Sequence, residues 1–222
     1  MAWHRIQAIT LRHLKQLPQD VNQWSSAIFW PFLNIVLFGG AGSWIHTSRS
    51  DVALFTLIAG VTLWQLVVRI NFGISLGFFQ EVLSRNVVNL FSTPLRLTEW
   101  ILGMVIYSCL IGSVTLLYCC GIVWLLYGYN ILHIGYFLIY TTTQLFIAGS
   151  AIGFFGTSLL MLWGARVQAV IFMVAVAAAP LSGAFYPIHI LPAPLQNVAY
   201  CLPFSHIFSG LFTYILYGTW SL

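Results

Sequence analysis

Charged side chains are what this sequence has least of. Only 5% of its 222 residues are Asp, Glu, Lys or Arg, and four of these are acidic. A soluble domain carries about 25% charged residues because its surface must be hydrated. Since 60% of the residues are hydrophobic, an ordinary soluble fold is excluded, and lipid is expected to cover most of the surface. Nine tryptophans fit this view, because Trp is enriched at bilayer interfaces.

The groups that would power transport or hydrolysis are missing as well. Lys15 is the one lysine and follows Leu14, so the chain has no Gly-Lys-Ser/Thr loop for a nucleotide, and we expect no ATP hydrolysis by this chain itself. Carriers coupled to protons or sodium usually place an ionisable group near the bilayer midplane. All four acids instead sit at the ends of apolar stretches or in loops: Asp20, Asp51, Glu81 and Glu99.

The sequence also shows no cluster of residues that would bind a metal or catalyse a reaction. The four cysteines show no metal-ligand spacing and are expected to be free thiols: Cys109, Cys119, Cys120 and Cys201. His189 and His206 fall in the same part of the chain, but no third ligand or nucleophile accompanies them. We therefore predict no catalytic residue, no metal and no cofactor bound by this chain. The net charge of +4 is small and dispersed, so no nucleic-acid partner is expected.

Residues 1–18 predict an amphipathic helix that lies in the membrane interface. At about 100° per residue, one side carries the apolar residues and a threonine: Trp3, Ile6, Thr10, Leu14 and Leu17. The far side carries three cations, which are expected to anchor the helix at the headgroups: Arg5, Arg12 and Lys15. Trp3 would add an aromatic anchor. A soluble amphipathic helix is the alternative, and Pro18 ends the helix in either case.

Five apolar stretches predict transmembrane helices in an all-α polytopic membrane protein with a single transmembrane domain. They cover residues 24–44, 52–79, 101–127, 136–162 and 167–183. Arg69 falls inside the second stretch and is expected to extend toward the interface, although a functional arginine within the membrane stays open. Residues 184–222 are rich in proline, which predicts outward re-entrant helices, with a partial sixth span as the alternative.

The distribution of basic residues predicts the orientation. With the N-terminus inside, six cations face the cytoplasm and Arg49 faces outward, leaving Arg69 aside. The six are Arg5, Arg12, Lys15, Arg85, Arg96 and Arg166. The opposite orientation would reverse this ratio. We therefore expect a multi-pass protein of the cell (inner) membrane with a cytoplasmic N-terminus.

Two segments resemble those of ABC type-2 transporter permeases. The first is the inner segment Leu90-Phe-Ser-Thr-Pro-Leu-Arg-Leu-Thr-Glu-Trp-Ile-Leu-Gly103. The second is the outward segment Pro180-Leu-Ser-Gly-Ala-Phe-Tyr-Pro187, and it continues with further motif residues. The family motif of this outward segment falls on Pro180, Gly183, Phe185, Pro187, Pro192 and Pro203. The second segment is the more specific of the two.

The resemblance implies the membrane-spanning permease subunit of an ATP-driven ABC exporter. By analogy, ABC ATPase subunits bind ATP and Mg, and a second permease copy or homologue completes a dimer in membrane lipid. An amphiphilic or lipid-linked cargo suits the aromatic, nearly uncharged interior. Residues 81–93 would form the coupling helix that docks on the ATPase. Its expected contact residues are Glu81, Leu83, Arg85, Asn86, Val87, Leu90 and Thr93.

One feature departs from the family pattern. The family carries a sixth span after the outward helices, whereas here the sequence stops at Leu222, where that span is expected to begin. Two alternatives therefore stay open beside the exporter: an ATP-independent carrier or channel, and an assembly subunit that transports nothing itself. Transport by the isolated chain would favour the first alternative. Co-purification with a permease whose transport does not need this chain would favour the second.

Overall fold

The chain is a bundle of helices, which confirms the predicted all-α fold. The computed structural model describes residues 3–17, 21–45, 51–84, 92 and 95–218, and these ranges contain no strand. The long helices are α1 (Trp3–Gln16), α2 (Val21–Ile45), α3 (Asp51–Leu83), α5 (Leu97–Tyr127), α6 (Tyr136–Trp163), α7 (Gln168–Leu181), α8 (Ala193–Tyr200) and α9 (Pro203–Tyr217). Among the described residues, short 3₁₀ segments join some of these helices: η2 (Ile131–Ile134), η3 (Gly164–Val167) and η4 (Ile188–Ile190).

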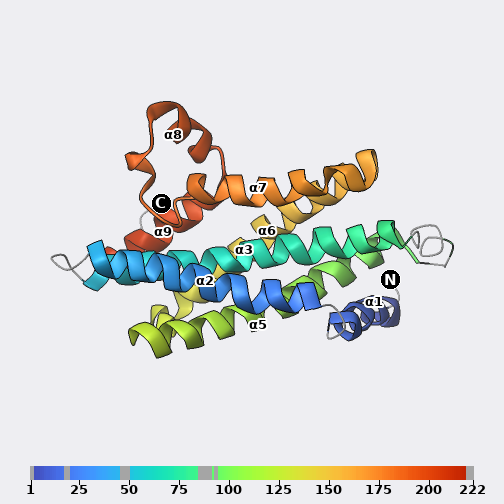
Figure 1. Cartoon of the computed structure of the whole chain (residues 1–222), viewed down its shortest axis with the longest axis horizontal. Helices are drawn as coiled ribbons and strands as arrows, with labels where there is room; N and C mark the ends of the chain where they lie inside the picture. The colour runs from blue at the N-terminus through green and yellow to red at the C-terminus, as the bar shows by residue number, and fades with distance from the viewer. Residues whose placement is uncertain (1–2, 18–20, 46–50, 85–91, 93–94, 219–222) are drawn as a thin grey trace.

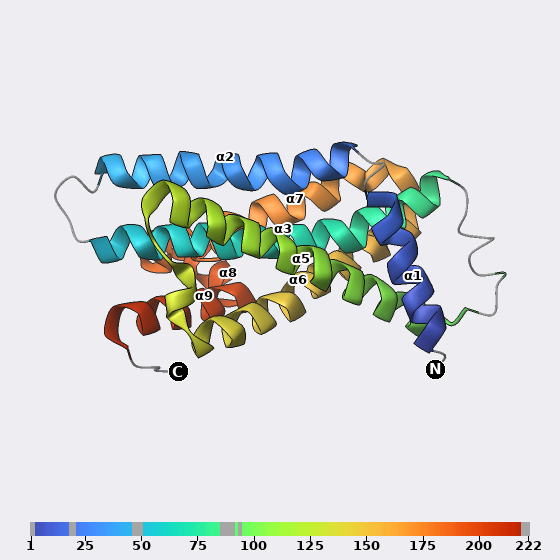
Figure 2. The same ribbon diagram turned by 90° about the horizontal axis from the view of Figure 1, so that it is seen from below.

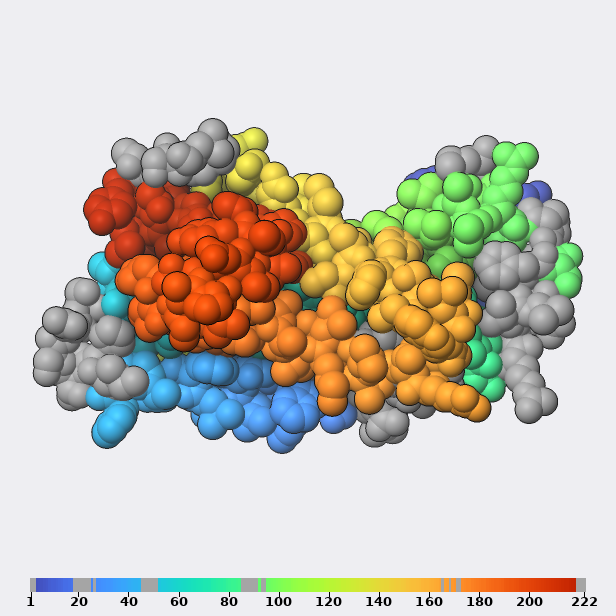
Figure 3. All heavy atoms as spheres, turned by 90° about the horizontal axis from the view of Figure 1, so that it is seen from above, coloured from blue at the N-terminus to red at the C-terminus, as the bar shows by residue number. Residues whose placement is uncertain are grey.

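The helices α2, α3, α5, α6 and α7 run along the length of the molecule (Figure 1). Helix α1 lies at the end where α3 stops and α5 starts, and it crosses the bundle steeply (Figure 2). Helices α8 and α9 gather at the opposite end, where Figure 3 shows them as one mass over the bundle. The two ends of the molecule are therefore built from different parts of the chain.

Helix α3 is the centre of the bundle. Within its apolar stretch, 67% of the residues are buried, compared with 22%, 28% and 39% for those of α2, α5 and α6. Ile70 packs where Gly112 of α5 and Gly149 of α6 carry no side chain, and glycine allows this close approach. One turn later, Ser75 Oγ donates a hydrogen bond to the carbonyl of Gly153 at 2.9 Å. Small residues on α6 thus seat the helix against α3.

Four helices of the described chain are long and apolar enough to cross a membrane. They contain residues Ala27–Trp44, Val52–Leu83, Leu97–Tyr127 and Tyr136–Trp163. The fifth predicted span, residues 167–183, is shorter than expected: α7 has 14 residues, below the roughly 20 of a full crossing. The 3₁₀ segment η3 replaces its start, and Pro180 stands in its last turn. Helices α8 and α9 meet at 94° and would make a fifth crossing if counted together.

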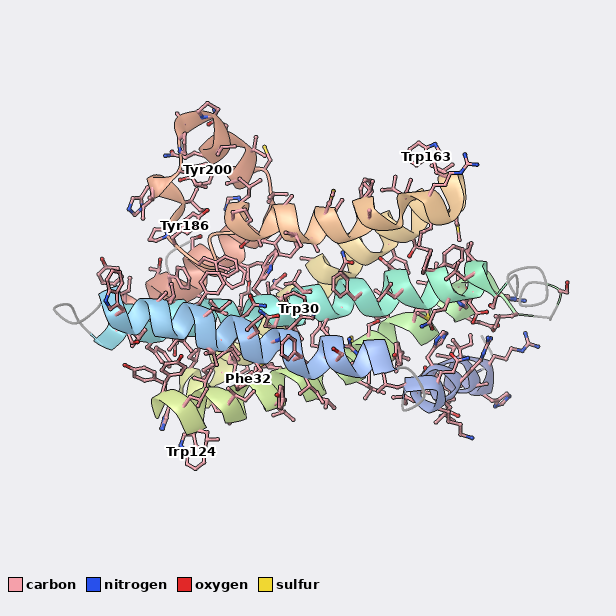
Figure 4. All side chains as sticks on the ribbon, viewed as in Figure 1. Trp30, Phe32, Trp124, Trp163, Tyr186 and Tyr200 are labelled. Atoms are coloured by element: carbon pink, nitrogen blue, oxygen red, sulfur yellow. The ribbon has the colours of Figure 1, made fainter. Side chains whose placement is uncertain are left out.

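Exposed tryptophans lie at both ends of the bundle. Trp124 of α5 is 63% exposed and Trp163 of α6 is 60% exposed. Figure 4 shows the two at opposite ends of the long axis. Such positions suit the two interfaces of a bilayer, where the indole ring meets both hydrocarbon and headgroups. Large apolar side chains between these ends are also exposed, which fits a surface solvated by lipid.

Candidate functional site

Helix α1 is docked on the bundle by a buried face. Ile6, Ile9, Thr10 and His13 are the buried residues of the helix. Ile9 lies over Gly103 of α5, where an added Cβ would come within 2.9 Å of its side chain. Thr10 Oγ1 donates to the Gly103 carbonyl at 3.2 Å. The prediction that this side of the helix faces the acyl chains is therefore wrong for Ile6 and Thr10, which pack on protein, whereas Trp3 is 59% exposed.

The first of two ion pairs joins α1 to the end of α3. Arg12 Nη2 lies 2.7 Å from Oε1 of Glu81, and the exposed fractions of the two side chains are 39% and 4%. The carboxylate is thus almost removed from solvent, and the guanidinium compensates its charge. Arg12, which was expected to anchor the helix at lipid headgroups, thus pairs with the end of α3, and its contact with headgroups stays a prediction.

The second ion pair joins α1 to the start of α5. Arg5 Nη1 lies 3.5 Å from Oε2 of Glu99, whose side chain is 1% exposed. The same Oε2 accepts a hydrogen bond from the backbone N–H of Arg96, the N-cap residue of α5, at 3.2 Å. Glu99 therefore satisfies one of the free N–H groups that begin a helix, and its charge also suits the positive end of the helix dipole. Arg5, like Arg12, therefore pairs with a buried carboxylate of the bundle.

Together the two pairs attach one helix to both ends of the connection between α3 and α5. Glu81 precedes this connection by a few residues, and Glu99 follows it within the first turn of α5. Because the pairs are made by two arginines of a single rigid helix, the distance between the two ends is fixed through α1. Such an arrangement can pass a displacement of the connection to α3, α5 and α1 as a unit.

The predicted coupling residues divide into two groups. Glu81 and Leu83 belong to the last turn of α3, so no separate helix begins at residue 81. Glu81 is buried, whereas Leu83 is 59% exposed. The remaining predicted contacts lie outside the described residues: Arg85, Asn86, Val87, Leu90 and Thr93. Of the anchor residues, Trp3 is 59% exposed and Lys15 is exposed as well, which leaves both available to lipid.

Three polar residues meet behind α1. His13, Arg69 of α3 and Tyr107 of α5 line a small cavity of about 10 Å³, the size of one water molecule. The His13 and Tyr107 rings have centroids 5.4 Å apart. Burial lowers the pKa of His13 below its usual 6.5; nearby Glu81 opposes this shift, and Arg12 adds to it. Near neutral pH the histidine is therefore in its neutral form, beside the buried carboxylate of Glu81.

The expectation that Arg69 extends to the membrane interface is wrong. Only 6% of this residue is exposed, and it lines the same small cavity as His13 of α1 and Tyr107 of α5. Hydropathy alone cannot distinguish an arginine that reaches the interface from one that a neighbouring helix covers. His13 was not singled out from the sequence. Its spacing from Ile6 and Ile9 was the available signal.

The family motif residues of the second segment, which was predicted to face outward, lie at the other end of the bundle from α1. Pro187, Pro192 and Pro203 each stand at the start of a helix, where proline costs no hydrogen bond. Gly183 has φ +75°, which turns the chain after α7. The Phe185 ring packs on Phe38 of α2 with centroids 4.8 Å apart. These residues shape the outward segment. Within the described part of the chain, no three His, Cys, Asp or Glu side chains gather as metal ligands.

Comparison with known families gives one match of nearly full length. The family model of the ABC-2 type transporter matches residues 4–216. A comparison with curated proteins finds no match. The family match includes nearly all of α1, the connection between α3 and α5, and helices α8 and α9 almost to their end. This chain belongs to the ABC-2 type transporter family and is the membrane-spanning permease subunit of an ABC transporter.

Proposed function

We propose that this permease exports an amphiphilic or lipid-linked substrate, driven by ATP hydrolysis on separate ATPase subunits. ATP and Mg²⁺ would bind to those partners and not to this chain. The observation that carries the proposal is the double attachment of α1 through Arg12–Glu81 and Arg5–Glu99. An ATPase that binds the connection between α3 and α5 would then move three helices at once, rather than one loop.

Exposed Leu83 supports the same assignment. It ends α3 at the edge of the connection and leaves 59% of its surface open, beside a buried Glu81. An apolar side chain at a helix end suits docking into a groove of a partner protein. In this proposal the α1 end of the bundle and the N-terminus are cytoplasmic, in the cell (inner) membrane. The outward segment faces the other side.

The proposal includes a dimer with a second permease copy or homologue, surrounded by membrane lipid. Large apolar residues of α2 and α5 are exposed along the bundle, including Phe29, Leu37, Val114 and Leu117. Such surfaces need lipid or another helix as their solvent. A substrate with a long apolar part is compatible with walls of this kind, whereas a highly charged solute would be costly to move between them.

Changing Leu83, Val87 and Leu90 together to Asp tests the assignment. We expect the variant to insert normally but to lose ATPase subunits in a mild-detergent pull-down, and to lose substrate-stimulated hydrolysis. Leu132→Asp is the matched control, because Leu132 is 55% exposed in η2 at the opposite end. The proposal fails if the triple variant retains both binding and stimulation. Transport by the purified chain without an ATPase would also contradict it.

A further inference from the structure

The outward end contains a cavity that the mechanism above does not use. It measures about 510 Å³ and lies between the N-terminal part of α3, residues 183–189, Tyr200 of α8 and one side of α9. This volume falls within the range of small-molecule sites, about 300–1,000 Å³. An apolar cavity of roughly 150 Å³ already holds benzene. The space is therefore large enough for a long hydrocarbon chain.

Its inner wall offers hydrocarbon and few usable polar groups. Ala53, Leu57, Phe212 and Leu216 contribute apolar surface. The hydroxyl groups in the wall are occupied by backbone carbonyls of their own helices. Thr56 Oγ1 donates to Val52 at 2.7 Å, Thr213 Oγ1 to Ser209 at 2.9 Å, and Ser209 Oγ to His206 at 3.0 Å. A polar solute would find little to bind there, whereas an apolar chain would lose nothing by entering.

The outward segment supplies a different set of groups. Tyr186, His189 and Tyr200 also line the cavity, and His189 and Tyr200 are exposed. Within the described residues, the Tyr186 and Tyr200 hydroxyls and the His189 ring form no hydrogen bond. Figure 4 shows Tyr186 and Tyr200 on the segment that projects from the bundle. Donors of this kind suit an oxyanion such as a carboxylate or phosphate.

The cavity is held open by fixed contacts. The Ala184 carbonyl packs directly on Gly60 of α3, so the 183–189 segment approaches that helix as closely as backbones allow. Trp64 of α3 holds α9 from below, with its ring centroid 5.4 Å from that of Phe204. Both anchors lie in the buried core. The walls are therefore built from packed elements, and little ordering is needed when a ligand binds.

We infer that this cavity binds a single-chain amphiphile with an oxyanion headgroup, within one permease subunit. The chain lies against Leu57, Phe212 and Leu216, and the headgroup lies at Tyr186, His189 and Tyr200. A membrane lipid or a free fatty acid would share this chemistry. The site does not depend on the proposed direction of transport or on the ATPase, and the ligand need not be the cargo.

The test uses the purified chain in lipid nanodiscs and hexadecanoic acid that carries a mid-chain diazirine. After illumination, we expect saturable labelling concentrated on peptides that contain residues 183–189 and 209–216. Unlabelled hexadecanoate and lysophosphatidylglycerol are the competitors, and the better one identifies the source of the headgroup. Labelling spread over the exposed sides of α2 and α5, with competition by neither compound, would overturn the inference.

Ala53→Phe fills the cavity and should reduce this labelling about tenfold or more. Excluding two methylene groups from an apolar site already costs about that much affinity. Ala151→Phe is the matched control, since Ala151 is exposed on α6 and does not line the cavity. Size-exclusion profiles check whether both variants remain folded. If Ala53→Phe misfolds, Thr213→Leu replaces it, and unchanged labelling in a folded cavity variant contradicts the site.

The headgroup contacts have a separate readout. Tyr186→Phe combined with His189→Ala should weaken labelling by the carboxylate probe several-fold, because two donors are lost. A diazirine-bearing hexadecane without a headgroup should label this variant and the parent equally. Equal loss for both probes would mean that the variant damages the cavity, and no loss for either would remove the headgroup contacts. Because no ATPase is present, either failure leaves the proposed function standing.

Discussion

Arg12 and Glu81 form the shorter of the two ion pairs of α1, with Nη2 and Oε1 2.7 Å apart. The glutamate is buried at the end of α3, whereas the arginine remains 39% exposed on α1. The two charged groups therefore differ in their access to water. Removing the arginine leaves a buried charge with less compensation, while removing the glutamate leaves a cation that water can solvate.

Arg12→Gln should therefore destabilise the protein more than Glu81→Gln. We expect about 1–3 kcal/mol for the first change and less for the second, measured by reversible unfolding in mixed micelles. The double variant should show a coupling energy of at least about 0.5 kcal/mol. Lys15→Gln, an exposed change on the same helix, serves as the control and should stay within about 0.5 kcal/mol. A coupling energy of zero would show that the pair does not attach α1.

For the second ion pair, Arg5–Glu99, we expect removal of the glutamate to be the more destabilising change. Glu99 receives both the Arg5 guanidinium and the N–H of Arg96 at the start of α5. Glu99→Ala should therefore cost more than Arg5→Gln, because it removes the helix cap together with the ion pair. In Arg5→Gln the buried carboxylate keeps the Arg96 N–H and the positive end of the helix dipole as partners. A difference of about 1 kcal/mol is expected in the same unfolding assay. Equal losses would mean that the cap contributes nothing.

His13 predicts a dependence on pH. Burial lowers the pKa of His13 in the folded protein below its ordinary value of 6.5, so below about that pH the unfolded chain binds more protons than the folded one. The stabilisation is complete above pH 6.5 and decreases as the pH falls toward the lowered pKa. Accordingly, α1 should become more accessible to protease in mild acid. His13→Gln should flatten this dependence, while His4→Gln on the exposed side of α1 should retain it.

The contact between Gly60 and the Ala184 carbonyl is predicted to hold the 183–189 segment on α3. A Cβ at this position would collide with the Ala184 carbonyl, which is backbone and cannot rotate away. Gly60→Ala should cost about 1–3 kcal/mol through overpacking and should expose the 183–189 segment to protease. Gly121→Ala is the matched control, because nothing lies within 4 Å of its added Cβ. That change should be neutral or stabilising by up to about 1 kcal/mol, since alanine favours helix. A neutral Gly60→Ala variant would mean that the contact is loose.

The long helices could be predicted from the sequence because lipid imposes a simple rule. A stretch of about 20 apolar residues has few alternatives to a helix that satisfies its own backbone. The apolar runs at 101–127 and 136–162 correspond to α5 and α6 with ends that differ by a few residues. Proline density also predicted short, broken helices in residues 184–222 in place of a straight span. Pro192 and Pro203 begin α8 and α9.

The docked face of α1 could not be predicted in the same way. Hydropathy measures transfer from water and does not distinguish lipid from a protein neighbour as the apolar phase. The deciding residues lie elsewhere in the chain: Gly103 leaves room for Ile9, and Gly77 leaves room near His13. Arg12 and Glu81 are 69 positions apart in sequence, so their pairing depends on how the helices pack. The periodicity predicts the helix, whereas the packing of residues distant in sequence decides which of its faces is buried.

The uninterrupted length of α3 gives the molecule a lever. Its 33 residues span about 50 Å, from Asp51 near the amphiphile cavity to Leu83 beside the Arg12–Glu81 pair. If it pivots as a stiff rod about one end, a tilt of about 5° moves the far end by roughly 4 Å. Gly60 lies in the half of α3 nearer Asp51, where it contacts Ala184. A small tilt produced at the Leu83 end of α3 would therefore displace the Asp51 end far enough to separate α3 from the 183–189 segment.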